Sequence, residues 1–153
     1  MDTTTGELGE TGPGQHVGVG VGDATTAVGR VGLLGPDALL RAEGVAAFAA
    51  ATAAYYLLGG PLWLYLLLAL APDLSMVGYL AGTRVGSAAY NAAHTYVAPL
   101  ALAAAGLWVG TDLLVLGALV WAAHVGVDRA VGYGLKYPTG FGDTHLGRVG
   151  GGR

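Results

Sequence analysis

Four apolar runs follow one another along the chain from residue 38 to residue 134, separated only by connections of one to three residues, with glycine in the connection or at the end of a run beside it. They cover residues 38–58, 62–82, 86–110 and 112–134. Each run is long enough for an α-helix to cross the hydrocarbon core of a bilayer, which takes about 20 residues. Because backbone polar groups in lipid must be satisfied within their own segment, runs of this kind restrict the fold to membrane-spanning helices.

The composition supports lipid as the solvent for this chain. Hydrophobic residues make up 54% of the sequence and charged residues only 11%, whereas charged residues make up about a quarter of a usual soluble domain. A soluble helical bundle would need polar helix faces that these runs lack. Short connections place consecutive helices antiparallel, so we predict an all-α membrane protein with four antiparallel transmembrane helices in an up-down bundle.

The regions on either side of the runs differ in character. Residues 1–36 are rich in glycine and threonine, contain several acids and lack apolar periodicity, which predicts a disordered tail rather than a secretory signal. We expect the transmembrane domain over residues 37–148 and a flexible C-terminus over residues 149–153. The net charge of −3 argues against a nucleic-acid partner, and the absence of cysteine excludes thiolate ligands and thiol nucleophiles.

The positive charges predict the orientation in the membrane. If the N-terminal tail is cytoplasmic, all seven Lys and Arg residues fall on the cytoplasmic side, and the two outer connections hold none. These residues are Arg30, Arg41, Arg84, Arg129, Lys136, Arg148 and Arg153. We therefore expect a multi-pass protein of the plasma (inner) membrane with both termini in the cytoplasm and the lipid bilayer as its main partner.

Three ionisable residues on three different runs fall at one depth. Counting about 1.5 Å per residue from the inner end of each run, Asp73, His94 and His124 all lie roughly 12 to 14 Å from the inner boundary. Asp128 shares a helix face with His124 because the two are four residues apart. Pro72 should bend the second run beside Asp73, and Pro99 should break the third. Buried ionisable groups in a membrane are costly and usually pair, so a shared polar site in the cytoplasmic half of the bilayer is expected.

These side chains allow three interpretations. The first is an integral membrane protein of unknown biochemical function in which the cluster only holds helices together by hydrogen bonds. The second is a metal-dependent hydrolase for an amphiphilic substrate, with Asp73, His94, His124 and Asp128 binding a divalent Zn, Mn or Fe ion and His145 as a candidate catalytic acid or base. The third is the handling of a small solute or a proton, in a monomer or a homo-oligomer.

The segment after the fourth run, residues 132–148, has two interpretations. It is rich in glycine and holds Lys136, Phe141, Asp143 and His145. The favoured prediction is a juxtamembrane anchor whose basic residues contact anionic lipid heads. The alternative is a re-entrant lid that brings Asp143 and His145 back over the polar layer.

Several runs of sequence resemble one family in order. They are LLRAEG (39–44), PDLSMVGYLAG (72–82), YNAAHTYVAPL (90–100) and AHVGVDRAVGYGLKYPTGFGDTHLG (123–147). Together they are similar to the integral membrane family catalogued as domain of unknown function 4260, over about residues 38–148. The resemblance implies a four-helix membrane protein and carries no activity over to this chain.

A second, weaker similarity is to membrane-bound metal-dependent hydrolases of the DNA-damage-induced type. Those proteins carry a Pro-Asp pair on one helix, a later histidine, and a His-x-x-x-Asp pair on a further helix. Here Pro72 and Asp73, then His94, then His124 and Asp128 occur in that order. This chain departs from that pattern at residues 74–75, where Leu-Ser replaces the usual second acid, and in having a single histidine in the middle element.

Overall fold

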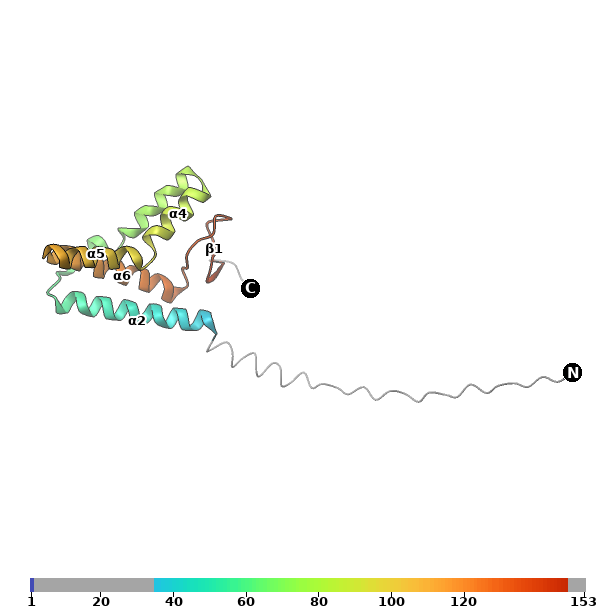
Figure 1. Ribbon diagram of the computed structural model, residues 1–153, viewed down its shortest axis with the longest axis horizontal. Coiled ribbons are helices and arrows are strands. Elements are labelled where there is room, and N and C mark those ends of the chain that lie inside the picture. The colour runs from blue at the N-terminus through green and yellow to red at the C-terminus, as the bar shows by residue number, and fades with distance from the viewer. Residues whose placement is uncertain (2–34, 149–153) are drawn as a thin grey trace. The chain divides into compact units, whose positions relative to one another are not determined.

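The helix α6 (Asp112–Val131) is the central element of the fold. The computed structural model describes residues 35–148 and Met1. In this part of the chain, α6 packs against α2 (Pro36–Leu57), α5 (Val97–Val109) and the short α3 (Leu62–Leu68) (Figure 1). The predicted all-helical architecture is confirmed, apart from two very short strands near the C-terminal end.

The remaining elements form two small pairs. The 3-10 helix η1 (Pro72–Ala81) packs against α4 (Thr83–Ala93), and Figure 1 shows this pair directed away from α2, α5 and α6. The strands β1 (Asp143–Thr144) and β2 (Gly147–Arg148) pair antiparallel. The predicted tail lies outside the described residues except for Met1 and its last two residues, and the predicted flexible end at 149–153 lies outside them entirely.

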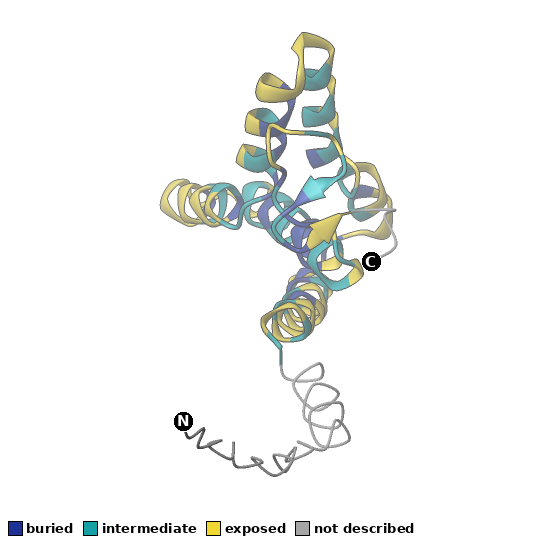
Figure 2. Ribbon diagram, turned by 90° about the vertical axis from the view of Figure 1, so that its right-hand side faces the viewer, coloured by how far each residue is buried: buried dark blue, intermediate teal, exposed yellow. Residues whose placement is uncertain are grey.

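Within residues 35–148, two helices are long and apolar enough to cross a membrane. They are Leu62–Ala81, which joins α3 to η1, and α6. A third span results if the bent pair α4 and α5 is counted as one. Figure 2 shows exposed residues over the outer faces of the helices, and many of them are large and apolar, such as Leu57, Leu80 and Trp108. Such a surface is expected of a protein whose solvent is lipid.

The second apolar run, in which a bend at Pro72 is predicted, changes there from α-helix to 3-10 helix. Proline has no N–H, so Pro72 cannot donate to the carbonyl of Leu68 four residues earlier. Ala71 N donates to that carbonyl instead, at 3.0 Å, which tightens the chain into 3-10 geometry. As a result α3 ends at Leu68 and the chain continues as η1, with Asp73 in its first turn.

The third apolar run breaks before Pro99, as predicted. α4 ends at Ala93, α5 begins at Val97, and the two helix axes differ in direction by 44°. Pro99 lies in the first turn of α5, where its missing N–H costs nothing. The same residue could not continue a helix from α4, because its ring would clash with the carbonyl of Thr95.

The packing of α2 on α6 depends on two glycines, Gly44 and Gly126. A Cβ on Gly126 would lie 2.6 Å from Phe48 N and 2.9 Å from Gly44 O, and a Cβ on Gly44 would lie 2.7 Å from Gly126 O. The two backbones are therefore in direct contact, as small residues allow in membrane proteins.

Replacing Gly126 by valine should destabilise the protein by about 1–3 kcal/mol, because the two helices must separate to admit the side chain. The measurement is thermal unfolding followed by circular dichroism in detergent. Gly117→Ala on the same helix is the control, since a Cβ there finds its nearest neighbour at 3.9 Å. Equal stability of the two variants would show that α2 does not pack on α6 as described.

Candidate metal centre

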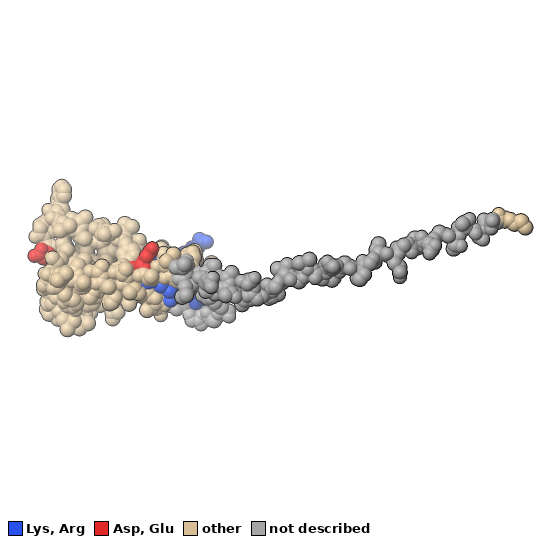
Figure 3. Space-filling view, turned by 90° about the horizontal axis from the view of Figure 1, so that it is seen from below, with Lys and Arg blue, Asp and Glu red and all other residues tan. Residues whose placement is uncertain are grey.

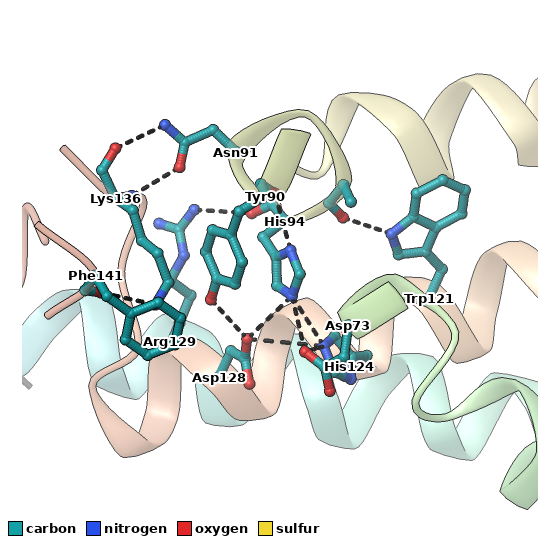
Figure 4. A network of polar contacts seen from close by, with 11 residues as sticks. Asp73, Tyr90, Asn91, His94, Trp121, His124, Asp128, Arg129, Lys136 and Phe141 are labelled. Atoms are coloured by element: carbon teal, nitrogen blue, oxygen red, sulfur yellow. Dashed lines mark hydrogen bonds and ion pairs between the residues drawn. The ribbon is translucent and has the colours of Figure 1, made fainter. Parts of the chain in front are cut away.

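The polar cluster forms where the second and third apolar runs are broken. Asp73 lies in the first turn of η1, His94 follows the last residue of α4, and His124 lies on α6 (Figure 4). One potential ligand atom from each residue lies within 4.8 Å of the other two. The predicted convergence of these three residues is therefore confirmed as a geometric fact. Both histidines are buried, whereas the Asp73 side chain keeps 38% of its surface exposed.

The spacing of the three ligand atoms suits one metal ion. His94 Nε2 lies 3.2 Å from His124 Nε2 and 3.3 Å from Asp73 Oδ1, and His124 Nε2 lies 3.5 Å from Asp73 Oδ1. In a tetrahedral site with bonds of about 2.1 Å, neighbouring ligand atoms lie roughly 3.4 Å apart. The separations of the three atoms therefore match the spacing that a tetrahedral Zn²⁺ ion would require. Two histidines and one carboxylate also suit Fe²⁺ and Mn²⁺.

A hydrogen bond to the backbone determines which ring nitrogen of His94 is free to bind a metal ion. His94 Nδ1 lies 2.9 Å from the carbonyl oxygen of Tyr90, one helical turn earlier. A carbonyl only accepts, so Nδ1 carries the hydrogen and donates it. In the neutral ring Nε2 then holds a lone pair that faces Asp73 and His124. This is the arrangement found in metal-binding histidines, whose other ring nitrogen donates to an oxygen that orients the ring.

Asp128 lies beside this group but is not one of its three compact members. Its Oδ2 is 3.6 Å from His94 Nε2 and 3.7 Å from His124 Nε2. The same oxygen accepts a hydrogen bond of 3.2 Å from the hydroxyl of Tyr90. The Tyr90 ring also stacks on His94, with centroids 3.7 Å apart. Tyr90 therefore orients both a histidine and a carboxylate of the cluster.

Two side chains of α6 satisfy the backbone at the break between α4 and α5. Trp121 Nε1 donates to the carbonyl of Ala93 at 2.6 Å, and Arg129 Nη2 donates to the carbonyl of His94 at 3.3 Å. These carbonyls would otherwise lack a partner at the end of a helix within the membrane. Neither role was predicted from the sequence. The sequence did hold a signal for them. A helix that is broken inside lipid needs hydrogen-bond donors for its free carbonyls, and only a few side chains at the same depth in the membrane can donate.

The segment after α6 folds back onto the cluster. The side chain of Asn91 holds the backbone of Lys136 on both sides: Asn91 Nδ2 donates to Lys136 O at 2.9 Å, and Lys136 N donates to Asn91 Oδ1 at 2.7 Å. Lys136 is 4% exposed. The favoured prediction of a lipid-contacting anchor is therefore wrong for Lys136, because backbone pairing with a residue of α4 draws this lysine inside.

Lys136 lines a cavity of about 380 Å³ together with Asp73, Tyr90, Asp128 and Phe141. Apolar atoms supply most of its lining, and we call it the polar cavity only because the charged side chains of Asp73, Asp128 and Lys136 gather in it. Its Nζ donates to the carbonyl of Phe141 at 2.9 Å and lies over the Tyr90 and Phe141 rings, at 4.7 and 3.5 Å from their centroids (Figure 4). Burial lowers the pKa of Lys136, and the carboxylates of Asp128 and Asp73 oppose that effect. A lid over the polar layer is thus present, but Lys136 and Phe141 form it.

The predicted residues of the lid, Asp143 and His145, lie elsewhere. His145 Nδ1 accepts a hydrogen bond of 2.8 Å from Leu135 N, and its Nε2 lies 3.3 Å from Arg129 Nη1. Asp143 accepts a hydrogen bond of 2.8 Å from the Thr139 hydroxyl. Neither residue lines the cavity that holds Asp73 and Asp128. These contacts hold the C-terminal segment together at the end of α6.

Replacing Asn91 by leucine should release the segment after α6. The change removes both hydrogen bonds to the Lys136 backbone and leaves those groups without their partners, at a cost of about 1–3 kcal/mol. We expect hydrogen exchange at residues 135–145 to accelerate about 10-fold or more while exchange in α6 is unchanged. Unchanged exchange in the C-terminal segment would contradict the account of how it is held.

The fold and the cluster define an all-helical membrane protein in which aspartate side chains lie beside two buried histidines. The chain belongs to the family described as Domain of unknown function (DUF4260), whose family model matches residues 37–149. The resemblance inferred from the sequence is thereby confirmed. No curated protein and no solved structure matches the chain.

Proposed function

We propose that this protein is a membrane-embedded metal-dependent hydrolase whose ion is held by Asp73, His94 and His124. The observation that carries the proposal is the convergence of one potential ligand atom from each of these residues within 4.8 Å. Two imidazoles and a carboxylate with an open fourth position are the ligand set of a catalytic zinc site. Iron and manganese are compatible with the same ligands.

The proposal places four spans in the plasma (inner) membrane with both termini in the cytoplasm. α2 is a fourth span of 22 residues, and its charged residues Asp37, Arg41 and Glu43 fall near its start, where they can reach the membrane surface. Arg41 lines one cavity with Gly132 and Arg148, so basic residues from both ends of the domain lie together. The Lys and Arg atoms visible in Figure 3 gather at one end of the described domain, which supports a cytoplasmic position for that end.

The chemistry follows from the ligands and from Asp128. A bound divalent ion lowers the pKa of a coordinated water and polarises the bond to be cleaved. Asp128 Oδ2 lies within 3.7 Å of both histidine nitrogens, so its carboxylate would be the nearby proton acceptor for a water held at a bound ion. The Tyr90 hydroxyl holds that carboxylate in place. We assign Asp128 the role of general base in preference to that of a fourth ligand.

The competing explanation is a cluster that only joins helices. In a neutral His94 the lone pair of Nε2 faces Asp73 Oδ1 at 3.3 Å, so two acceptors would meet with nothing between them. A cation resolves this conflict, and so does a proton, either on His94 or on His124 Nε2, which lies 3.2 Å from His94 Nε2 and 3.5 Å from Asp73 Oδ1. A protonated His94 paired with Asp73 and Asp128 would be a packing cluster, and its stability would not depend on any metal. The metal proposal and the packing proposal therefore differ in a measurable way.

The test is metal-dependent hydrolysis by protein purified in lipid nanodiscs. Chelator-treated protein is reloaded with Zn²⁺, Mn²⁺ or Fe²⁺ and given 4-nitrophenyl dodecyl phosphate or 4-nitrophenyl laurate, with His94→Ala as the comparison. We expect release of 4-nitrophenol that disappears on chelation, returns with one of the ions and is absent from the variant. A metal-independent protein that is equally stable before and after chelation would favour the packing cluster.

A further inference from the structure

An apolar cavity of about 480 Å³ opens beside the cluster, between α3, α5 and α6. The cavity is lined by apolar side chains of these helices, among them Leu64, Leu68, Leu102, Leu114 and Trp121. Gly117 also lines it and, having no side chain, leaves room there. A Cβ on Gly117 would find its nearest neighbours at 3.9 and 4.0 Å, so the space in front of this glycine is open. The cavity has the chemistry of a site for a hydrocarbon chain.

The cluster lies between this apolar cavity and the polar cavity that holds Lys136. On the segment that begins η1, Pro72 and Ser75 line the apolar cavity, whereas Asp73 and Met76 line the polar one. Ala93 of α4 lines the apolar cavity, and Tyr90 lines the polar one. On α6, His124 lies between Trp121 of the apolar cavity and Asp128 of the polar cavity. The metal group therefore lies between an apolar cavity and a cavity that holds the charged side chains of Asp73, Asp128 and Lys136.

The charges in the cavity that holds Lys136 favour a ligand with an anionic head group. A divalent ion at the metal group offsets the carboxylates of Asp73 and Asp128, and the ammonium of Lys136 then leaves the loaded site positive.

We propose that the substrate is a single-chain amphiphile with an anionic head group. Its hydrocarbon chain lies in the apolar cavity along Gly117 and Trp121, its head group lies in the polar cavity near Lys136, and the bond between them lies at Asp73, His94 and His124. The position of the head group rests on the proposed metal site. The position of the chain rests on the apolar cavity alone, so the two parts are tested separately.

Trp121 supplies the probe for the chain. The sequence has three tryptophans, of which Trp63 and Trp108 are exposed by 66% and 91% on the outer surface. Replacing Trp63 and Trp108 by phenylalanine leaves Trp121 as the single reporter, inside the cavity. The protein in phosphatidylcholine nanodiscs, loaded with Zn²⁺, is titrated with 12-bromododecyl phosphate, whose bromine quenches tryptophan fluorescence at short range. 12-Bromododecyl trimethylammonium has the same chain and the opposite charge.

The matched variants fill the cavity or leave it empty. Gly117→Leu places a side chain in the open space, and Ala104→Leu adds the same side chain at an exposed position of α5 outside the cavity. We expect saturable quenching of Trp121 that weakens by about 10-fold or more in the first variant and is unchanged in the second. Gly117→Ala gives an intermediate step should the larger replacement disturb folding.

The outcomes separate this inference from the proposed function. Quenching that rises linearly without saturation, and equally in Gly117→Leu, is the result of bulk lipid and would overturn the chain site even when Zn²⁺ is bound. Saturable quenching with equal affinity for phosphate and ammonium would overturn the anionic head group. Saturable binding of phosphate in preference to ammonium, lost on Lys136→Met, supports the whole proposal. If the protein binds no Zn²⁺ but quenching of Trp121 still saturates, the proposed hydrolase is contradicted and the binding site for the hydrocarbon chain is supported.

Discussion

His94→Ala and His124→Ala are each expected to weaken Zn²⁺ binding by more than about 100-fold. Loss of a residue that only orients a metal ligand already costs about 10- to 100-fold in affinity, and each of these residues would supply one of three ligand atoms. The measurement is competition for Zn²⁺ with a chromophoric chelator, using protein in nanodiscs whose helix content is checked by circular dichroism.

His145→Ala is the matched control for these variants. This histidine is outside the metal group and contacts Leu135 and Arg129, so its loss should leave Zn²⁺ affinity within about 3-fold. Equal loss of affinity in all three variants would indicate nonspecific binding to histidine. Unchanged affinity in both His94→Ala and His124→Ala would show that their convergence serves packing alone.

The second large effect is expected for Asp128→Asn. Asparagine has the same shape as aspartate and cannot accept a proton, so the rate of hydrolysis should fall by about 10²- to 10⁴-fold. Zn²⁺ affinity should change little, because the compact ligand group holds Asp73, His94 and His124 without Asp128. The readouts are Zn²⁺ competition and release of 4-nitrophenol from 4-nitrophenyl dodecyl phosphate.

Comparing the Zn²⁺ affinity of Asp128→Asn with its rate of hydrolysis assigns the role of Asp128. If the variant still binds Zn²⁺ but hydrolyses the substrate much more slowly, Asp128 is a general base. Loss of Zn²⁺ together with the rate would make Asp128 the fourth ligand, as the sequence analysis proposed. A variant that keeps both metal and rate would remove Asp128 from the mechanism and contradict the assignment made above.

The convergence of the cluster was predictable because it depends on local rules. Helix rise fixes the depth of Asp73, His94 and His124 along their runs, and proline chemistry fixes the breaks that open beside the first two. Both breaks occur beside polar residues, and Asp73, His94 and His124 lie together. Their juxtaposition could therefore be predicted by counting along the sequence, whereas their role as metal ligands stays a prediction.

The lid could not be predicted in the same way. Lys136 is in a glycine-rich stretch that resembles any basic juxtamembrane segment, and its burial depends on Asn91, 45 positions earlier in the chain. The pairing of Trp121 with the carbonyl of Ala93 is similarly a contact between two helices. Contacts of this kind depend on how the bent helices cross, which the pattern of a single sequence does not determine.

The most direct test of the account is the metal content of the wild-type protein. The protein is purified in detergent without chelator, and its metals are counted by plasma mass spectrometry beside the His94→Ala/His124→Ala double variant. The account predicts close to one equivalent of Zn, Mn or Fe in the wild type and none in a double variant that keeps its helix content. Wild-type protein that is folded, free of metal and unable to bind Zn²⁺ on addition would contradict the metal centre and leave a hydrogen-bonded cluster in its place.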